Sequence, residues 1–266
     1  MTQSTLLALQ NKHILVTRPA HQASHLIELL KAVGATVSCQ PLIDIVPLQQ
    51  PDKASHLIKA LPQTDIAIFI SQNAVSHGLN LINRINELPT SLKLATIGAG
   101  SAQLLEELSG RPVDITPLGQ YNSEGLLAHP ELQEIQGKRI IIFRGIGGRN
   151  LLADTLRQRG AIVEYAEVYR RQAPAIDLQQ LEQNWQAQPI DAICITSGEG
   201  LDNFVDALQQ TPQTDSLKTI VFNCQLIIVN QRLEKRVVDY GFTKKPVITD
   251  NVSDKAIVDA IIKTFT

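Results

Sequence analysis

An internal repeat at an offset of 126 residues constrains this chain more than any other feature. Residues 13–37 read as a short apolar run, a turn, an amphipathic stretch and a Gly-Ala pair, and residues 139–163 follow the same order. Arg18 aligns with Arg144 at this offset. A fixed period of this kind indicates a duplicated structural unit, so the fold must accommodate two versions of one arrangement.

The repeat continues beyond the first segment of each copy. Residues 65–71 (DIAIFIS) align with residues 191–197 (DAICITS), again at 126. Residues 94–98 align with residues 226–230 at 132, and we place the six extra residues in a loop around 211–216. Three separated segments with nearly constant spacing make chance similarity a poor explanation. We call residues 13–98 the first copy and residues 139–230 the second copy.

Short β-branched runs alternate with stretches such as LIELLKAVG and LLADTLRQRG, whose apolar residues recur at helical spacing. This alternation predicts an α/β fold with parallel sheets and helices on both faces, flavodoxin-like or Rossmann-like. Ligands of such sheets bind beyond the carboxyl ends of the strands. The residues that follow the predicted strands are therefore the first candidates for a site: Arg18, Ser71, Gly98, the 144–149 turn, Ser197 and Asn230.

Composition narrows the class of protein. With 266 residues, 44% hydrophobic and 19% charged, the chain is typical of a globular protein with two domains. A net charge of −2 argues against a nucleic-acid partner, although a locally basic pocket is compatible with it. We expect no membrane span and no leader segment. Cys39, Cys194 and Cys224 show no paired spacing, so we expect free thiols, two of them in the core, and a cytoplasmic protein.

Two glycine-rich turns precede predicted helices. Gly145-Ile146-Gly147-Gly148-Arg149 and Gly98-Ala99-Gly100 both lack the third glycine of a dinucleotide fingerprint, which argues against nicotinamide binding. The free N–H groups of a helix start beside Arg144 and Arg149 favour an anion. A tight turn that simply needs glycine is the alternative explanation.

Several polar residues have both a structural and a functional interpretation. Ser71 and Ser197 each end a strand and precede a helix, so each can cap that helix, donate to a ligand, or do both. His21 and His25 share a helical face, but no third ligand accompanies them, and we predict no metal site. Asp65 and Asp191 precede strands in both copies, which favours a role in a turn over catalysis, and we expect Trp185 to pack in the core.

Tyr169 occupies the position that Ile43 has in the first copy, so one copy carries a phenol where the other is apolar. A phenol is protonated at neutral pH and can donate a hydrogen bond or a proton. From the sequence alone, a packing tyrosine on an amphipathic strand remains an equal alternative.

Taken together, these residues resemble the uroporphyrinogen-III synthase family. The resemblance rests on short segments whose order and spacing cover nearly the whole chain: residues 16–19 (VTRP), 69–75 (FISQNAV), 97–102 (IGAGSA), 122–126 (NSEGL), 144–149 (RGIGGR), 160–161 (GA), 169–170 (YR) and 196–197 (TS). The family implies two flavodoxin-like α/β domains linked by a two-stranded β-ladder. One domain would comprise residues 1–38 with 173–266 and the other residues 48–164, with residues 39–47 and 165–172 as linking strands.

The resemblance also implies a chemistry without a metal or other cofactor. Hydroxymethylbilane, a linear tetrapyrrole, would lose its terminal hydroxyl as water and close with inversion of the last ring through a spiro-pyrrolenine, in the route to haem. By itself this substrate closes to the type I isomer, so the enzyme would act mainly by holding a folded geometry. We expect a monomer that binds neither nucleic acid nor membrane, in the cytoplasm, with its working surface in the cleft between the two domains.

The family's tyrosine, which assists hydroxyl departure, matches Tyr169. The carboxylates of the substrate would meet backbone N–H groups and polar side chains at the strand ends: Arg18, Ser71, Gln72, Asn73, Gly98, Ser101, Ser123, Arg144, Gly145, Gly147, Gly148, Arg149, Thr196, Ser197, Asn230 and Arg232.

This chain departs from the family pattern in three places, one of which, Ser101 where threonine is commoner, keeps the hydroxyl. Residues 229–234 (VNQRLE) lack the usual glycine and threonine donors, and Arg232 is our candidate replacement; Gly198 stands where serine is frequent. Two other functions stay open at this point. A cytosolic anion-binding module without catalysis predicts tight binding and no turnover, and a nucleotide-dependent enzyme predicts stabilisation by NAD or ATP.

Overall fold

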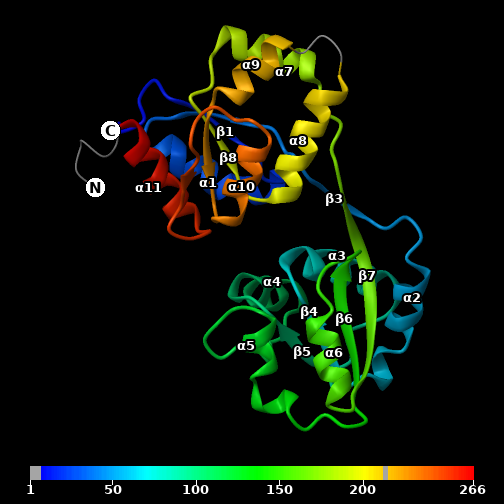
Figure 1. The fold of residues 1–266 in the computed structure, drawn as a ribbon. Helices are drawn as coiled ribbons and strands as arrows, with labels where there is room; N and C mark the ends of the chain where they lie inside the picture. Colours follow the sequence, from blue (N-terminus) through cyan, green and yellow to red (C-terminus); the bar gives the residue numbers. More distant parts are fainter. Residues whose placement is uncertain (1–6, 212–214) are drawn as a thin grey trace. The chain divides into compact units, whose positions relative to one another are not determined.

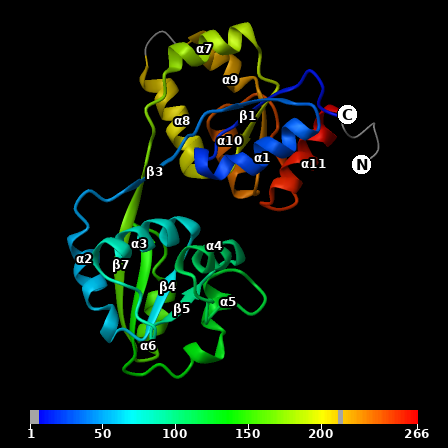
Figure 2. The same cartoon turned by 180° about the vertical axis from the view of Figure 1, so that it is seen from behind.

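The computed structural model describes residues 7–211 and 215–266, which form two compact α/β units. Unit 1 consists of the chain up to Asp44 and from Gln172 onwards, and unit 2 consists of Ile45–Arg171. Figures 1 and 2 show the two units from opposite sides. The loop in which we placed the six extra residues of the second copy contains residues 212–214, which lie outside the described part of the chain.

Unit 1 contains a five-stranded parallel sheet in the order β2-β1-β8-β9-β10. Its elements in chain order are β1 (His13–Val16), α1 (Ala20–Ala32), β2 (Thr36–Cys39), α7 (Leu178–Ala187), β8 (Ala192–Ile195), α8 (Gly198–Gln210), α9 (Asp215–Phe222), β9 (Gln225–Ile228), α10 (Arg232–Asp239), β10 (Val247–Ile248) and α11 (Asp254–Phe265). Numbered within the unit, this order is 2-1-3-4-5, the strand order of flavodoxin-like folds, one of the two architectures that the sequence predicted.

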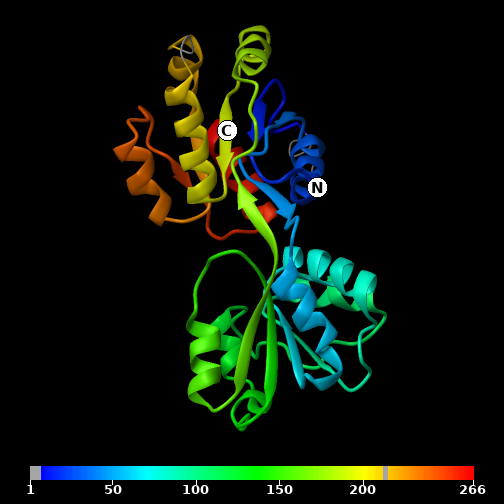
Figure 3. The same ribbon diagram turned by 90° about the vertical axis from the view of Figure 1, so that its right-hand side faces the viewer.

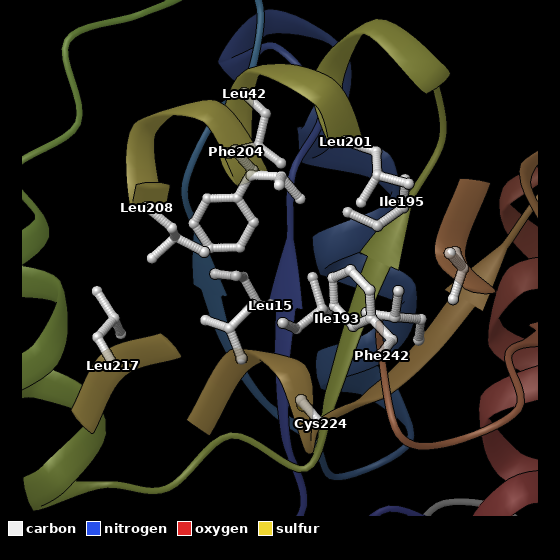
Figure 4. Packing of buried hydrophobic residues seen from close by; sticks show 14 of the residues in the cluster. Leu15, Leu42, Ile193, Ile195, Leu201, Phe204, Leu208, Leu217, Cys224 and Phe242 are labelled. Carbon is white, nitrogen blue, oxygen red and sulfur yellow. The ribbon is translucent and has the colours of Figure 1, made fainter. Parts of the chain in front are cut away.

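Alternate residues of the unit 1 strands point to opposite faces of the sheet, and helices cover both faces. Ile14 and Val16 pack against α1 and α11, whereas Leu15 faces the layer that contains α7, α8 and α9. Figure 4 shows this second layer, with Phe204 of α8 over Leu15 and Ile193 of the central strands. Both faces of each central strand are therefore buried, which explains why these strands read as continuous apolar runs.

Unit 2 contains the second sheet, in the order β3-β7-β6-β4-β5, with parallel pairing from β7 through to β5. Its elements are β3 (Asp44–Pro47), α2 (Asp52–Lys59), the 3₁₀ turn η1 (Leu61–Gln63), β4 (Ile66–Phe69), α3 (Gln72–Ile85), β5 (Lys93–Thr96), α4 (Ala99–Ser109), α5 (Ser123–Leu127), the 3₁₀ turn η2 (Pro130–Leu132), β6 (Arg139–Gly145), α6 (Leu151–Gln158) and β7 (Ile162–Gln172).

Helices lie on both sides of the unit 2 sheet as well (Figure 3). Phe69 and Phe143 stack at 4.5 Å between their ring centroids on the face covered by α2, α3 and α4. Ile68 and Ile142 face the opposite layer, which α5 and α6 form. Gly78 of α3 lies directly over the two phenylalanine rings, since a Cβ there would lie 2.9 Å from Phe69.

Each sheet combines segments from both copies of the repeat. In unit 1, β1 and β2 come from the first copy and β8 and β9 from the second; in unit 2 the origins are reversed. Ile14 lies opposite Ala192 in unit 1, and their equivalents at the 126 offset, Ile140 and Ile66, lie opposite each other in unit 2. The two sheets therefore have the same register, with the leading βαβ segments exchanged between the copies.

Asp65 and Asp191 connect these exchanged strands. The Asp65 carboxylate accepts a hydrogen bond from the backbone N–H of Arg139 at 2.8 Å, and Asp191 accepts the same bond from His13 at 2.8 Å. In both units the lysine before the partner strand also donates to the aspartate. Their role is structural, as predicted, but each aspartate joins two strands rather than stabilising a turn within one segment.

Other predictions concern single residues and element ends. Trp185, Cys194 and Cys224 are buried in the unit 1 core, and burial raises the pKa of each of these two thiols to about 12. Helix α1 begins one residue before the predicted His21, and α6 begins one residue after the predicted Asn150. The segment proposed as a linking strand at 165–172 is the second half of β7, which is already paired with β6 from Ile162 onwards.

Candidate active site

A pocket of about 140 Å³ lies at the edge of the unit 2 sheet where the carboxyl ends of its strands meet. Strand ends, the β6–α6 turn and the first turn of α5 all contribute to its wall. The polar and charged lining residues are Ser123, Arg144, Arg149, Tyr165, Tyr169 and Arg171, together with the glycines of the turn at 145–148. The sheet topology thus brings together several residues that are far apart in the sequence, at the edge where ligands of such folds bind.

Tyr169 reaches its position through an irregularity in β7. Arg144 pairs with Glu167, but the next residue, Gly145, pairs with Tyr169, so β7 contains one extra residue at this point. Such a bulge turns the following side chain toward the other face of the sheet. Val168 and Tyr169 consequently both pack in the cluster on the α3 side, although regular alternation would place them on opposite faces.

The phenol ring of Tyr169 is held by three neighbours and is only 3% exposed. Its hydroxyl lies 3.3 Å from the hydroxyl of Ser71, within hydrogen-bond distance. The ring of His77 stacks on it at 5.5 Å between centroids, with 30° between the ring planes. Gly145 lies against its other side, since a Cβ there would come within 2.5 Å of the ring. The residue is therefore buried and fixed in orientation, with its hydroxyl at the strand ends.

Ser71 has the capping role that the sequence predicted, and its hydroxyl also contacts Tyr169; donation to a ligand stays a prediction. It is the N-cap of α3, because its hydroxyl accepts a hydrogen bond from the backbone N–H of Ala74 at 3.1 Å. The same hydroxyl is the partner of Tyr169. Its neighbour Gln72 donates to the backbone carbonyl of Gly100 at 3.2 Å and thereby joins the starts of α3 and α4.

Arg144 is the penultimate residue of β6, within the strand rather than after it as predicted, and it is 3% exposed, which is unusual for an arginine. Its Nε donates to the carbonyl oxygen of Gly145 at 3.1 Å, and its guanidinium lies 4.4 Å from the ring centroid of Tyr165. In the turn that follows, Gly147 and Gly148 have φ of 78° and 100°, a region that favours glycine. The tight turn that needs glycine is thus present, and it lines the pocket; anion binding there stays a prediction.

The charged side chains that line the pocket are all cationic. They are Arg144, Arg149 and Arg171, and no aspartate or glutamate belongs to its wall. Arg149 is largely exposed, and the nearest carboxylate oxygen, from Glu124, lies 3.9 Å away. A protein with a net charge of −2 therefore carries a locally basic pocket, a possibility that the composition left open.

The remaining predicted residues of unit 2 lie around the same edge. Gly98 is the N-cap of α4, and its carbonyl oxygen accepts from the backbone N–H of Ser101, which is 6% exposed. Ser123 begins α5 and lines the pocket. Asn73 lies in the first turn of α3, next to Gln72. Gly98, Ser101, Gln72 and Asn73 are thus at the starts of α3 and α4, outside the wall of the pocket.

The predicted residues of unit 1 lie at the equivalent edge of its own sheet. Thr196 and Ser197 follow β8, and Ser197 caps α8 by accepting from the backbone N–H of Gly200 at 3.0 Å. Asn230 and Arg232 follow β9 at the exposed start of α10. Arg18 follows β1, but its guanidinium already pairs with Asp254 at the start of α11, which also receives a hydrogen bond from His25 at 2.7 Å.

Comparisons with known proteins address the whole chain. A family described as uroporphyrinogen-III synthase HemD matches residues 24–246. The uroporphyrinogen-III synthase of Escherichia coli K12 is 33% identical over 249 residues, covering 93% of this chain and 99% of its own, and that of Salmonella typhimurium is 32% identical over the same share. The chain belongs to the uroporphyrinogen-III synthase family.

Solved uroporphyrinogen-III synthase structures share its fold. A mutant of the Thermus thermophilus enzyme aligns with a TM-score of 0.59 at 17% identity, covering 95% of this chain and 98% of that one. The enzyme of Helicobacter pylori 26695 aligns with a TM-score of 0.57 at 12% identity, covering 95% and 99%. The predicted α/β fold with parallel sheets and flanking helices is confirmed.

Sequence reasoning missed three polar partners in this uroporphyrinogen-III synthase family member. The Arg144 guanidinium lies over the ring of Tyr165, and Asp254 pairs with Arg18. Arg236 lies next to Gly198, since a Cβ on residue 198 would come within 2.7 Å of the Arg236 guanidinium. Arg236 also pairs with Asp202 of α8. No motif signals these contacts, because each joins residues that are distant in sequence or belong to different elements.

The described part of the chain shows neither a metal cluster nor a membrane-spanning helix. Within 7–211 and 215–266, no group of three or more His, Cys, Asp or Glu side chains is arranged to hold a metal ion. His25, one of the two histidines considered at the outset, pairs with Asp254 instead. Over the same ranges, no helix combines the length and the apolar character that crossing a membrane requires.

Proposed function

We propose that this chain is a uroporphyrinogen-III synthase that closes hydroxymethylbilane with inversion of the last ring, and that the unit 2 pocket with Tyr169 is part of its active site. Membership of the family supports the activity. The reaction makes it a lyase, since the ring closure expels water, in the route to haem and other tetrapyrroles.

The observation that carries the site is the combination of a phenol and an all-cationic pocket wall. The substrate bears an acetate and a propionate on each of its four pyrroles, so it is strongly anionic. A pocket lined by three arginines and no carboxylate attracts such a ligand, and arginine pairs with carboxylates through two parallel hydrogen bonds. Gly147 and Gly148, whose positive φ favours glycine, place no side chain at the pocket, so their backbone N–H groups are accessible there.

Held at this edge, the terminal hydroxyl of the substrate would lie near the phenol of Tyr169. The phenol donates its proton to the departing hydroxyl, which leaves as water and produces a protonated azafulvene. The substituted carbon of the last pyrrole then attacks, the spiro-pyrrolenine forms and re-opens, and the final closure releases a proton that balances the first one. The Ser71 hydroxyl, 3.3 Å from the phenol oxygen, orients this donor.

We also propose that the polar edge of the unit 1 sheet supplies substrate contacts of its own. Ser197 and Thr196 resemble Ser71 and Ile70 in their position after a central strand, and Ser197 caps α8 as Ser71 caps α3. Asn230 and Arg232 are exposed and available at the start of α10. Arg18 is held in position by its ion pair with Asp254. We therefore expect a neutral substitution of either residue to weaken the contact between Arg18 and the substrate.

The activity is tested by incubating the protein with enzymatically generated hydroxymethylbilane and separating the product isomers by chromatography. We expect the type III isomer in excess over the type I isomer that forms without enzyme. A product that contains only the type I isomer, at a protein concentration well above that of the substrate, would contradict the proposed function and favour a binding module.

The role of Tyr169 is tested with Tyr169→Phe, which removes one oxygen and keeps the ring in its contacts with Gly145 and His77. We expect the rate of type III formation to fall about 100-fold, the lower part of the range for a general acid, because water can replace the donor in part. Tyr240→Phe is the matched control: it deletes another hydrogen-bonded phenol oxygen, in unit 1, whose partner is Asp202. An unchanged rate for Tyr169→Phe would make Tyr169 a packing residue.

We propose that the protein acts as a monomer in the cytoplasm. All three cysteines are free thiols, which is typical of proteins from a reducing compartment. Light scattering during size-exclusion chromatography would test the monomer directly, since a dimer would have twice the 29.2 kDa mass of the chain.

A further inference from the structure

Arg144 is a buried cation whose charge is not balanced by an acidic side chain. It is 3% exposed, and within the described residues no aspartate or glutamate forms an ion pair with it. A guanidinium stays charged at any physiological pH, so burial removes hydration from a permanent charge. Burial of an unpaired charge is unfavourable, and proteins retain such a group where a ligand supplies the missing charge.

Three contacts fix the orientation of the Arg144 guanidinium. Its Nε donates to the carbonyl oxygen of Gly145 at 3.1 Å. Its Cζ lies over the Tyr165 ring, 4.4 Å from the ring centroid. On the far side, a Cβ on residue 148 would lie 2.7 Å from Nη2, so only glycine leaves room for this end of the guanidinium. The group is therefore clamped along its whole length while it lines the pocket.

Tyr165 is itself anchored independently of Arg144. Its hydroxyl donates to the side-chain oxygen of Asn150, at the start of α6, at 3.3 Å. Arg157 of α6 also lies over the ring, with Cζ 5.5 Å from the centroid, and donates to the backbone carbonyl of Val163 at 2.9 Å. The ring is half-buried against the α6 layer of the core. It is a rigid platform rather than a mobile surface side chain.

We propose that Tyr165 is a positioning residue: its ring holds the Arg144 guanidinium flat against the pocket wall, so that Arg144 binds one carboxylate of the substrate in the unit 2 pocket. The electron-rich ring face offsets part of the lost hydration of the guanidinium. A carboxylate partner would neutralise the charge, whereas the ring does not. The charge thus remains available to the ligand. This inference rests on the proposed function, because the carboxylate is that of the tetrapyrrole substrate.

The test compares KM and kcat for type III formation in three variants. Arg144→Leu removes the cation, and we expect KM to rise about 100-fold. Tyr165→Leu removes the ring and leaves the cation, and we expect KM to rise about 10-fold with kcat within about 2-fold of the wild type, the pattern of lost ground-state binding. Because Tyr165 acts only through Arg144, the double variant should have the KM of Arg144→Leu alone.

Two further variants separate positioning from general stability. Tyr165→Phe keeps the ring under the guanidinium and loses only the hydroxyl bond to Asn150, so its KM should stay within about 2-fold of the wild type, far below that of Tyr165→Leu. Arg157→Ala removes the other cation over the same ring, outside the pocket, but leaves the ring and its bond to Asn150, so it should raise KM much less than Tyr165→Leu. Arg144→Lys addresses the case in which Tyr165→Leu fails to fold: lysine keeps the charge but neither stacks flat nor donates from Nε, so KM should rise at least 5-fold.

Each outcome decides a separate question. If KM rises additively in the double variant, or if Tyr165→Leu or Arg144→Lys retains the wild-type KM, the positioning role is overturned while the activity stands. If the wild-type protein forms no type III isomer, the proposed function itself fails, and the positioning role fails with it.

Discussion

The close approach of Gly145 to Tyr169 gives a prediction whose size follows from the structure. In Gly145→Ala, the new methyl carbon would lie 2.5 Å from Cε2 and 2.7 Å from Cζ of the phenol ring. Carbon atoms in contact are normally about 3.5–4.0 Å apart, so the ring or the strand must move by about 1 Å. The backbone at Gly145 lies outside the left-handed region, and alanine is therefore excluded only by this neighbour.

Two effects follow, and their magnitudes differ enough to be separated. Overpacking of a core contact costs about 1–3 kcal/mol, which a domain stable by about 5–15 kcal/mol tolerates. A displacement of about 1 Å at a reacting group can cost about 100-fold in rate, and here it would also break the contact of 3.3 Å between the phenol and Ser71. We therefore expect a folded protein that forms the type III isomer about 100-fold more slowly, with type I product in its place.

Gly78→Ala is the matched control, because it introduces the same methyl group against ring atoms 2.9–3.0 Å away without touching Tyr169. Its cost of overpacking is partly offset by the better helix propensity of alanine, by about 1 kcal/mol. Circular dichroism and thermal unfolding should show both variants folded at the assay temperature, and the chromatographic assay should separate them. If the two variants form type III product at rates within 2-fold of each other, the fixed position of the phenol is irrelevant to catalysis and our reasoning is refuted.

Two further predictions concern single polar side chains. Ser71→Ala should destabilise the protein by about 1 kcal/mol through loss of the α3 cap, and it should also slow type III formation. Ser253→Ala removes only the cap of α11 and should lower the unfolding free energy without changing the rate. Equal rates for the two variants would exclude a role of Ser71 beyond capping. The hydrogen bonds that Asp65 accepts from Lys138 and from the Arg139 backbone lower the pKa of its carboxyl, so its stabilising effect is present above about pH 4 and is lost as the pH falls through the lowered value. In urea titrations, Asp65→Asn should thus be less stable than wild type at pH 6 and approach it toward pH 3, and parallel curves across this range would contradict the assignment.

The repeat predicted more of the fold than any single motif did. The common offset correctly aligned Ile14 with Ile140 and Asp65 with Asp191, and these equivalent residues have equivalent strand partners. Whether each sheet contains one copy or parts of both is not encoded in the offset, because parallel strands of like register can pair in either way. The resemblance to the family, rather than periodicity, supplied the interleaved arrangement.

The candidate site was predictable where function follows from strand position and unpredictable where it depends on packing. Ser71 and Arg144 were recognised because they lie at the carboxyl ends of strands in a parallel sheet. The orientation of Tyr169 was not, because a bulge depends on how β7 pairs with β6 and leaves no mark in a single strand. The stacking of Arg144 on Tyr165 was missed for a similar reason: 21 positions separate them, and their contact depends on the β6–β7 register.

The bulge also explains how one of two similar copies differs at the edge that we propose to be catalytic. In a regular β7, residues 165 and 169 would face the same side of the sheet, and both tyrosines would lie against the α6 layer. The extra residue turns Tyr169 to the α3 side, next to Ser71, and leaves Tyr165 under Arg144. One inserted residue thus gives two phenols of one strand different partners, a hydroxyl in one case and a cation in the other. The first copy has Ile43 in place of Tyr169, so the duplicated scaffold differs between its copies at the position where the proposed acid is needed.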